Sequence, residues 1–203
     1  MKALALTLLV ACGGKIPETR YYQLAAPVTK SIPGYELLVL ENLETDAGYD
    51  DERIVYRTTP YRLDYYQYHR WSAAPGVMVG NFLEQALEHS GMFRSVVRQP
   101  TPDAPVVLGG RVVAIEEVDT NPKHWVGRIV IELALTDAHT GTRLWSEQFE
   151  ETEPLDKQTP EGLAQALSNA MSRIAERVAP TIANLANRQA RAHAAETTVV
   201  RRI

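Results

Sequence analysis

The clearest alternation of apolar and polar positions lies between residues 125 and 136. Successive side chains of an extended chain point to opposite faces, so this spacing places the apolar residues on one face of a strand. They are Trp125, Ile129, Ile131, Leu133 and Leu135. Residues 137–141 then have turn chemistry, and residues 143–150 resume an extended pattern. We therefore predict two long antiparallel strands joined as a hairpin.

Shorter runs of strand-forming residues lie earlier in the chain and are bounded by proline or glycine. They cover residues 21–24, 36–40, 53–57, 61–71 and 92–97. A longer apolar run at residues 106–118 contains Gly109 and Gly110, which suits a central strand bulged at the glycines.

Two segments have helical periodicity instead. Pro75 suits the first turn of a helix that ends at Gly91, with a buried face formed by Val79, Phe82, Leu83, Ala86 and Leu87. A second helix begins after the capping residue Thr159 and is expected to break or kink at Pro180. Its apolar stripe is Leu163, Leu167, Ala170, Met171, Ile174 and Val178. The predicted fold class is α+β, a single domain with a mainly antiparallel or mixed sheet covered by two helices.

Composition supports one globular domain. The 203 residues are 45% hydrophobic and 23% charged, and the formal net charge is −4. A mildly acidic chain lacks the broad basic face that nucleic-acid binding requires, so we expect no nucleic-acid partner.

The N-terminus has the pattern of a lipoprotein signal peptide. Lys2 precedes a short apolar stretch, and Leu9, Val10 and Ala11 form a lipobox before Cys12, the one cysteine of the chain. A small residue fits the signal peptidase at the cleavage point, and only a thiol forms the thioether to diacylglycerol. We predict cleavage before Cys12, which then carries covalent diacylglycerol and an N-acyl chain and holds the protein at a membrane.

These features divide the chain into four parts: a signal peptide at 1–11, a lipidated tether at 12–20, the α+β domain at 21–187 and a flexible basic tail at 188–203. By resemblance to Gram-negative lipoprotein sorting, Gly13 after the lipidated cysteine favours the periplasmic face of the outer membrane.

The segment at residues 61–71 is unusually aromatic and offers rings on both faces of its predicted strand. Tyr, Trp and Arg are enriched at binding hot spots, so Tyr65, Tyr66, Tyr68, Arg70 and Trp71 are the candidate partner interface. Packing of the same residues into the core and the sheet edge is the alternative.

Four segments together resemble the ABC-type transport auxiliary lipoproteins, the PqiC-like family. They are residues 21–24, residues 53–57, the aromatic run ending in Trp71, and the helix that leads into residues 90–94. The resemblance implies a non-catalytic periplasmic component of an intermembrane lipid transport system, which binds an MCE-type bridge protein and is compatible with a homo-oligomer. The alternatives are an envelope-assembly or secretion lipoprotein, or a lipoprotein hydrolase.

No catalytic or metal-binding motif accompanies these features. The chain has no phosphate-binding loop and no nucleophile elbow, and we expect no cofactor apart from the lipid on Cys12. The adjacent Glu116 and Glu117 should point to opposite faces of their strand, which disfavours a shared acid and base role. The histidines are too widely spaced for a local zinc motif, so a site would have to be assembled from distant elements. They are His69, His89, His124, His139 and His193.

Overall fold

The computed structural model describes residues 17–28 and 34–200, with side chains described as far as residue 196. The predicted signal peptide and Cys12 lie outside the described residues. In chain order the elements are β1 (Arg20–Tyr22), β2 (Leu37–Leu40), β3 (Glu44–Thr45), β4 (Arg53–Thr59), β5 (Arg62–Trp71), α1 (Pro75–His89), β6 (Ser95–Val97), β7 (Val106–Val118), β8 (Val126–Asp137), β9 (Arg143–Pro154) and α2 (Pro160–Val200). The predicted α+β class is confirmed.

The long strand β7 organises the sheet. One edge of β7 pairs antiparallel with β8 along its whole length, and β8 pairs in turn with β9. The other edge is shared by three short parallel partners, β2, β3 and β4, in that order along the strand. Strand β4 continues the sheet to β5 and β1, and β2 continues it to β6. The sheet is mixed because β7 has an antiparallel neighbour on one edge and parallel neighbours on the other.

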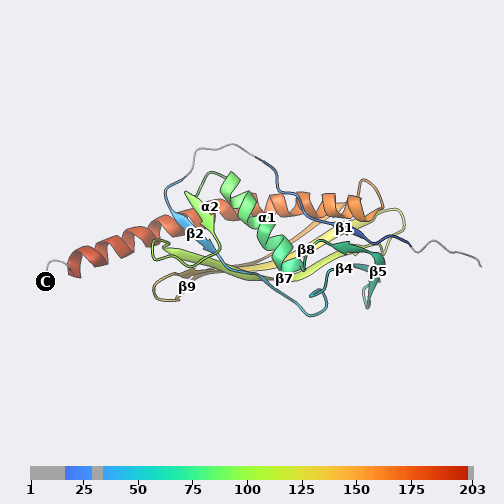
Figure 1. Cartoon of the computed structure of the whole chain (residues 1–203), viewed down its shortest axis with the longest axis horizontal. Coiled ribbons are helices and arrows are strands. Elements are labelled where there is room, and N and C mark those ends of the chain that lie inside the picture. Colours follow the sequence, from blue (N-terminus) through green and yellow to red (C-terminus); the bar gives the residue numbers. More distant parts are fainter. Residues whose placement is uncertain (1–16, 29–33, 201–203) are drawn as a thin grey trace, which may run out of the picture.

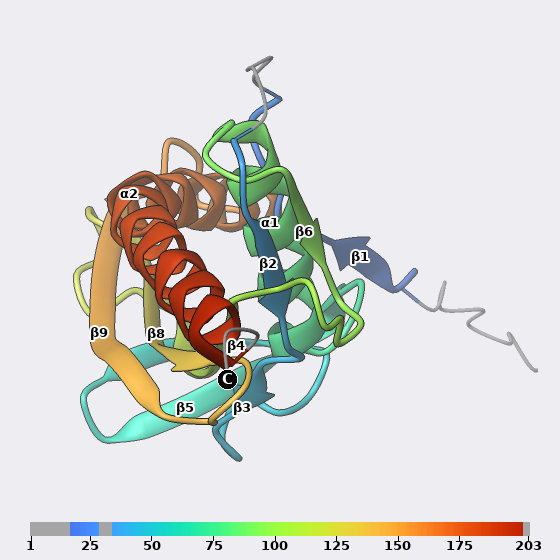
Figure 2. The same cartoon turned by 90° about the vertical axis from the view of Figure 1, so that its left-hand side faces the viewer.

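The sheet curves around α2, which lies along the length of the molecule (Figures 1 and 2). Helix α2 packs on β8 and β9, and α1 packs against α2, β6 and β7. Both helices begin as the sequence predicts. Pro75 lies in the first turn of α1, and the hydroxyl of Thr159 accepts a hydrogen bond from the amide of Gly162 at 3.1 Å. The predicted apolar stripes form the core, with Phe82, Leu83 and Leu167 almost fully buried.

The C-terminal half of α2 differs from the sequence expectation. The helix passes through Pro180 and continues to Val200, so residues 188–200 are helical where a flexible tail was expected. A proline removes one amide donor, and buried Ile182 and Ala186 hold the next turns against the core. Beyond them the chain is rich in alanine and arginine, both good helix formers.

The irregularity in β7 also lies elsewhere than expected. The register against β8 shifts between Val112 and Ala114, after the glycines rather than at them. Gly110 has a different role, because any side chain at this position would collide with the carbonyl oxygen of Glu132 on β8. The glycine therefore allows the close approach of two central strands.

Within the described residues, no helix combines the length and the apolar character that crossing a bilayer requires.

Candidate partner-binding site

The two faces of the sheet can be distinguished at Gly127 in β8. A side chain at this position would contact Leu163 and Leu167 of α2, so the position faces the helix. Glu117 of β7 lies directly opposite Gly127, and directly opposed residues share a face. Its neighbour Glu116 therefore points to the face away from α2. The prediction that the two glutamates point to opposite faces is confirmed.

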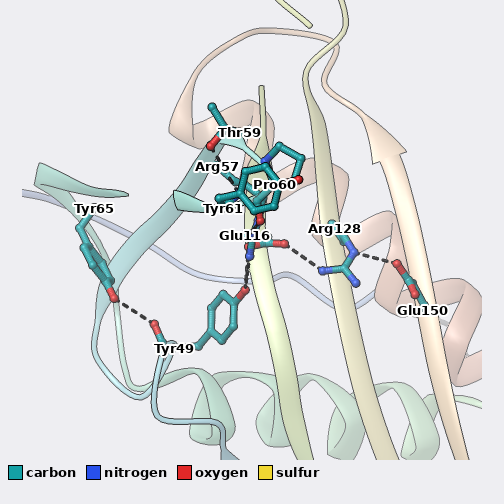
Figure 3. Close-up of polar contacts among 10 residues, drawn as sticks. Tyr49, Arg57, Thr59, Pro60, Tyr61, Tyr65, Glu116, Arg128 and Glu150 are labelled. Atoms are coloured by element: carbon teal, nitrogen blue, oxygen red, sulfur yellow. Dashed lines mark hydrogen bonds and ion pairs between the residues drawn. The ribbon is translucent and has the colours of Figure 1, made fainter. Parts of the chain in front are cut away.

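Glu116 is the centre of a buried polar cluster on the face away from α2 (Figure 3). Its side chain is 1% exposed. One carboxylate oxygen accepts hydrogen bonds from the hydroxyl of Tyr49 at 2.7 Å and from Nε and Nη2 of Arg57 at 3.2 and 3.1 Å. The other accepts from Arg128 at 2.9 Å, and Arg128 also contacts Glu150 at 2.7 Å. The cluster thus connects β4, β7, β8 and β9 with the loop that precedes β4.

The contacts of this cluster indicate a structural role rather than a catalytic one. Two guanidinium groups and a hydroxyl occupy the oxygens of Glu116, so the carboxylate is committed to partners within the protein. Burial and the hydrogen bond to Glu116 raise the pKa of Tyr49 to about 12, so its hydroxyl keeps its proton as a donor.

A second group of polar residues lies beside this cluster on the same face. Val55 of β4 is the direct neighbour of both Glu116 and Tyr65, which places Tyr65 on the face away from α2. The guanidinium of Arg53 lies over the Tyr65 ring, 4.2 Å from its centroid. Asp51 pairs with Arg53 at 2.9 Å and with Arg70 at 3.8 Å. We call Asp51, Arg53, Tyr65 and Arg70 the Tyr65 patch.

An irregular register brings Tyr65 and Arg70 to the same patch, although simple alternation assigns them to opposite faces. In the register of the two strands, Arg53 lies opposite Arg70 and Val55 lies opposite Tyr65. Two residue steps along β4 therefore correspond to five along β5. The additional residues of β5 change which side chains face outward. Tyr65 is 37% exposed and Arg70 has 35% of its side chain exposed, so both are accessible.

Two other residues of the predicted interface, Trp71 and Tyr66, lie elsewhere. Trp71 is fully buried in the core, so its assignment to the surface is corrected: it ends β5 next to β1 and packs inward. Tyr66 is half-buried and donates its hydroxyl hydrogen to Glu117 at 2.8 Å, on the face toward α2. Tyr68 is half-buried. Of the five predicted residues, the structure therefore brings Tyr65 and Arg70 together.

Glu117 is the second buried carboxylate of β7, and no arginine of the described part of the chain pairs with it. One of its oxygens accepts from Tyr66, and the other has no hydrogen-bond partner among the described residues. Burial is the main cause that raises the pKa of Glu117 to about 7, with the nearby charge of Asp119 adding to it. The surroundings of the adjacent glutamates therefore differ: Glu116 has two arginine partners, and Glu117 has none among the described residues.

At the far end of the β8–β9 hairpin, the structure also brings together potential metal ligands. Asp137, His139 and His193 each offer a ligand atom, and these atoms lie within 4.8 Å of one another. No local motif marks them in the sequence, because His193 comes from the segment of α2 that was expected to be a flexible tail.

Most residues of the Glu116 cluster and the Tyr65 patch have no signal in the sequence that predicts their place. Two consecutive glutamates in an apolar run predicted to be a central strand were the available signal, since buried carboxylates require partners. The partners themselves come from separate strands, and only the register of the sheet identifies them. They are Tyr49, Arg57 and Arg128.

The sequence matches the model of a known protein family. The family model of the ABC-type transport auxiliary lipoprotein component matches residues 22–179. The chain belongs to this family, as the resemblance in its sequence predicted. No curated protein matches the sequence closely enough to add to this assignment.

Solved structures with a similar fold are distant in sequence. Protein XCC0632 from Xanthomonas campestris has a TM-score of 0.71 and 20% identity, covering 84% of this chain and 99% of that chain. A structure of an uncharacterised protein has a TM-score of 0.69 and 17% identity, covering 82% and 99%. The PelC dodecamer from Paraburkholderia phytofirmans has a TM-score of 0.47 and 15% identity, covering 71% and 92%. The first two similarities support the fold alone.

Glu116→Gln should destabilise the protein by about 2 to 3 kcal/mol, because Arg57 and Arg128 would lose the negative charge that compensates their partial burial. Urea unfolding measures the change. Glu150→Gln is the matched control: Glu150 also pairs with Arg128 but has 52% of its side chain exposed, so it should cost less than about 1 kcal/mol. Equal losses in the two variants would contradict the scaffold role of Glu116.

Glu117→Gln should remove a pH dependence of stability. The pKa of Glu117 is raised to about 7 in the folded protein from an ordinary value of 4.5, so the wild-type protein loses stability as the pH rises through this range. The variant should therefore gain about 2 kcal/mol relative to wild type between pH 5 and pH 8. Urea unfolding at both pH values tests this, with the exposed Glu147→Gln as control. A gain that does not change with pH would contradict it.

Proposed function

We propose that the protein is an outer-membrane-anchored periplasmic lipoprotein and a non-catalytic auxiliary component of an ABC-type intermembrane lipid transport system. In this proposal Cys12 carries the lipid, and the Tyr65 patch binds an MCE-type bridge protein. Family membership supports the transport role and the lipoprotein character. The lipid anchor on Cys12, the choice of the outer membrane and the bridge protein come from the sequence prediction and are part of the proposal.

One observation supports the choice of surface: the Tyr65 patch combines a rigid ring with two guanidinium groups. Arg53 lies on the Tyr65 ring, and the hydroxyl of Tyr65 donates to the carbonyl of Gly48 at 3.2 Å, so the side chain is held from both ends. Holding an anchor residue in place before binding lowers the entropy cost of association. Tyr and Arg are also the residue types that contribute most at protein interfaces.

The surroundings of the patch match what a binding hot spot requires. Asp51 is shared by Arg53, which lies over the ring, and by Arg70, so both guanidinium groups lie beside one carboxylate. The Glu116 cluster lies beneath the adjoining loop and fixes Tyr49, the residue after Gly48. A partner with an acidic or carbonyl-rich surface would contact the arginine groups and cover the exposed part of the ring.

The double variant Tyr65→Ala, Arg70→Ala should weaken binding to a purified MCE-type bridge protein by about thirtyfold or more, since a hot-spot pair contributes at least about 2 kcal/mol. Surface plasmon resonance measures the dissociation constant. Tyr61→Ala is the matched control, because Tyr61 is 97% exposed in the turn before β5 and lies outside the patch. Circular dichroism monitors folding. Unchanged affinity in the folded double variant would reject this surface.

Cys12→Ser should release the protein from membranes into the soluble periplasmic fraction, because the acylated thioether is the proposed attachment. Membrane fractionation followed by mass spectrometry of the mature N-terminus measures attachment and acylation. Gly13→Asp tests the sorting step separately: it should leave acylation intact and move the protein to the inner membrane. A Cys12→Ser protein that remains in the membrane fraction would contradict the anchor.

A further inference from the structure

The end of the β8–β9 hairpin and the C-terminal part of α2 form a polar cluster that the proposed function does not use. In Figure 1 the last turns of α2, in red, extend past the end of the sheet. His193 in this part of the helix contacts Asp137 at the end of β8, and the two residues are 56 positions apart in the chain. The cluster therefore joins two distant segments.

Asp137 is oriented by its own turn. It is 3% exposed, and its Oδ1 accepts hydrogen bonds from the amides of His139 and Thr140 at 2.7 and 2.8 Å. Its Oδ2 points the other way, toward α2, where it contacts the side chains of Gln189 and His193. One oxygen is thus held by the backbone, and the other is presented to the helix.

Two imidazoles flank the presented oxygen. Nε2 of His193 lies 2.9 Å from Oδ2 of Asp137. The ring of His139 packs edge-on against the ring of His193, with 4.0 Å between their centroids. A surface hollow of about 360 Å³ opens on these residues and is also lined by Glu196, one turn after His193 on the same side of the helix. The hollow offers room for a further ligand.

These observations point to a metal site that neither the family assignment nor the sequence motifs indicate. We propose that Asp137, His139 and His193 bind one Zn²⁺ ion, with the fourth position taken by water or by Glu196. Two imidazole nitrogens and one carboxylate oxygen form a donor set typical of zinc, whereas Ca²⁺ and Mg²⁺ prefer oxygen ligands throughout.

Zinc binding requires small movements of the ligand atoms and displacement of the Gln189 side-chain amide, whose Nε2 contacts Oδ2 of Asp137 and lies 3.1 Å from Nε2 of His193. Zinc bonds of about 2.0 to 2.2 Å place tetrahedral ligand atoms roughly 3.3 to 3.5 Å apart. The three ligand atoms already lie within 4.8 Å of one another, and the 2.9 Å contact between His193 and Asp137 has only to lengthen slightly. His139 is exposed and His193 half-buried, so both rings are able to adjust. The bound ion fixes the last turns of α2 to the β8–β9 hairpin.

Zinc binding to the full chain, purified in detergent without a histidine tag and treated with chelator, tests the proposal. Dialysis against Zn²⁺ followed by mass-spectrometric metal analysis should give one equivalent per chain. His139→Ala should weaken Zn²⁺ binding at least tenfold. This variant keeps the backbone amide that contacts Asp137, so the turn should fold normally. His193→Ala should have the same effect, and His124→Ala is the matched control, an exposed histidine outside the cluster.

Hydrogen exchange provides a second measurement. Zn²⁺ should slow amide exchange in residues 185–196 of wild type and of His124→Ala, but not of His139→Ala. Wild-type protein that retains no Zn²⁺, or a His139→Ala, His193→Ala double variant that binds Zn²⁺ as tightly as wild type, would overturn the proposal. Because the site is separate from the Tyr65 patch, neither result bears on binding of a bridge protein.

Discussion

The candidate binding surface depends on the ion pairs and the hydrogen bond that the buried carboxylate of Glu116 makes. A charge that is 1% exposed is unfavourable unless it is paired, and Arg57, Arg128 and Tyr49 provide the compensation from three separate segments. Each partner is thereby fixed relative to β7. Tyr49 follows Gly48, whose carbonyl accepts a hydrogen bond from Tyr65. The buried ion cluster therefore helps to fix the position of Tyr65 in the exposed patch.

The organisation of β7 explains why this cluster occurs where it does. The strand exchanges partners along one edge, from β2 to β3 to β4, and Glu116 lies where β4 begins to pair. A purely apolar strand would hold β4 only through backbone hydrogen bonds and packing. Glu116 adds charged contacts to Arg57 of β4 and Arg128 of β8, so it joins strands on both sides of β7. The polar residue thus links three neighbouring strands at this point.

The sequence predicted those elements whose signals are local. Alternation identified β8, the turn residues identified its hairpin with β9, and Thr159 marked the start of α2. The errors arose where distant contacts decide the outcome. Helix α2 continues past Pro180 because Ile182 and Ala186 pack on the core, and Trp71 is buried because β5 ends beside β1. The Tyr65 patch depends on an irregular register between β4 and β5, which alternation within one strand does not reveal.

The first strand connects the proposed anchor with the proposed binding surface. Tyr21 of β1 pairs directly with Arg70 of β5, so the chain enters the domain at the strand that carries the patch. If Cys12 is lipidated, eight residue steps separate it from Arg20, and at about 3.3 to 3.6 Å per residue they reach no more than about 30 Å. Because Tyr21 lies directly opposite Arg70, such a tether would limit the distance of the patch from the membrane. In the proposed function, a short anchor attached beside the binding surface would therefore keep a bridge protein engaged close to the membrane.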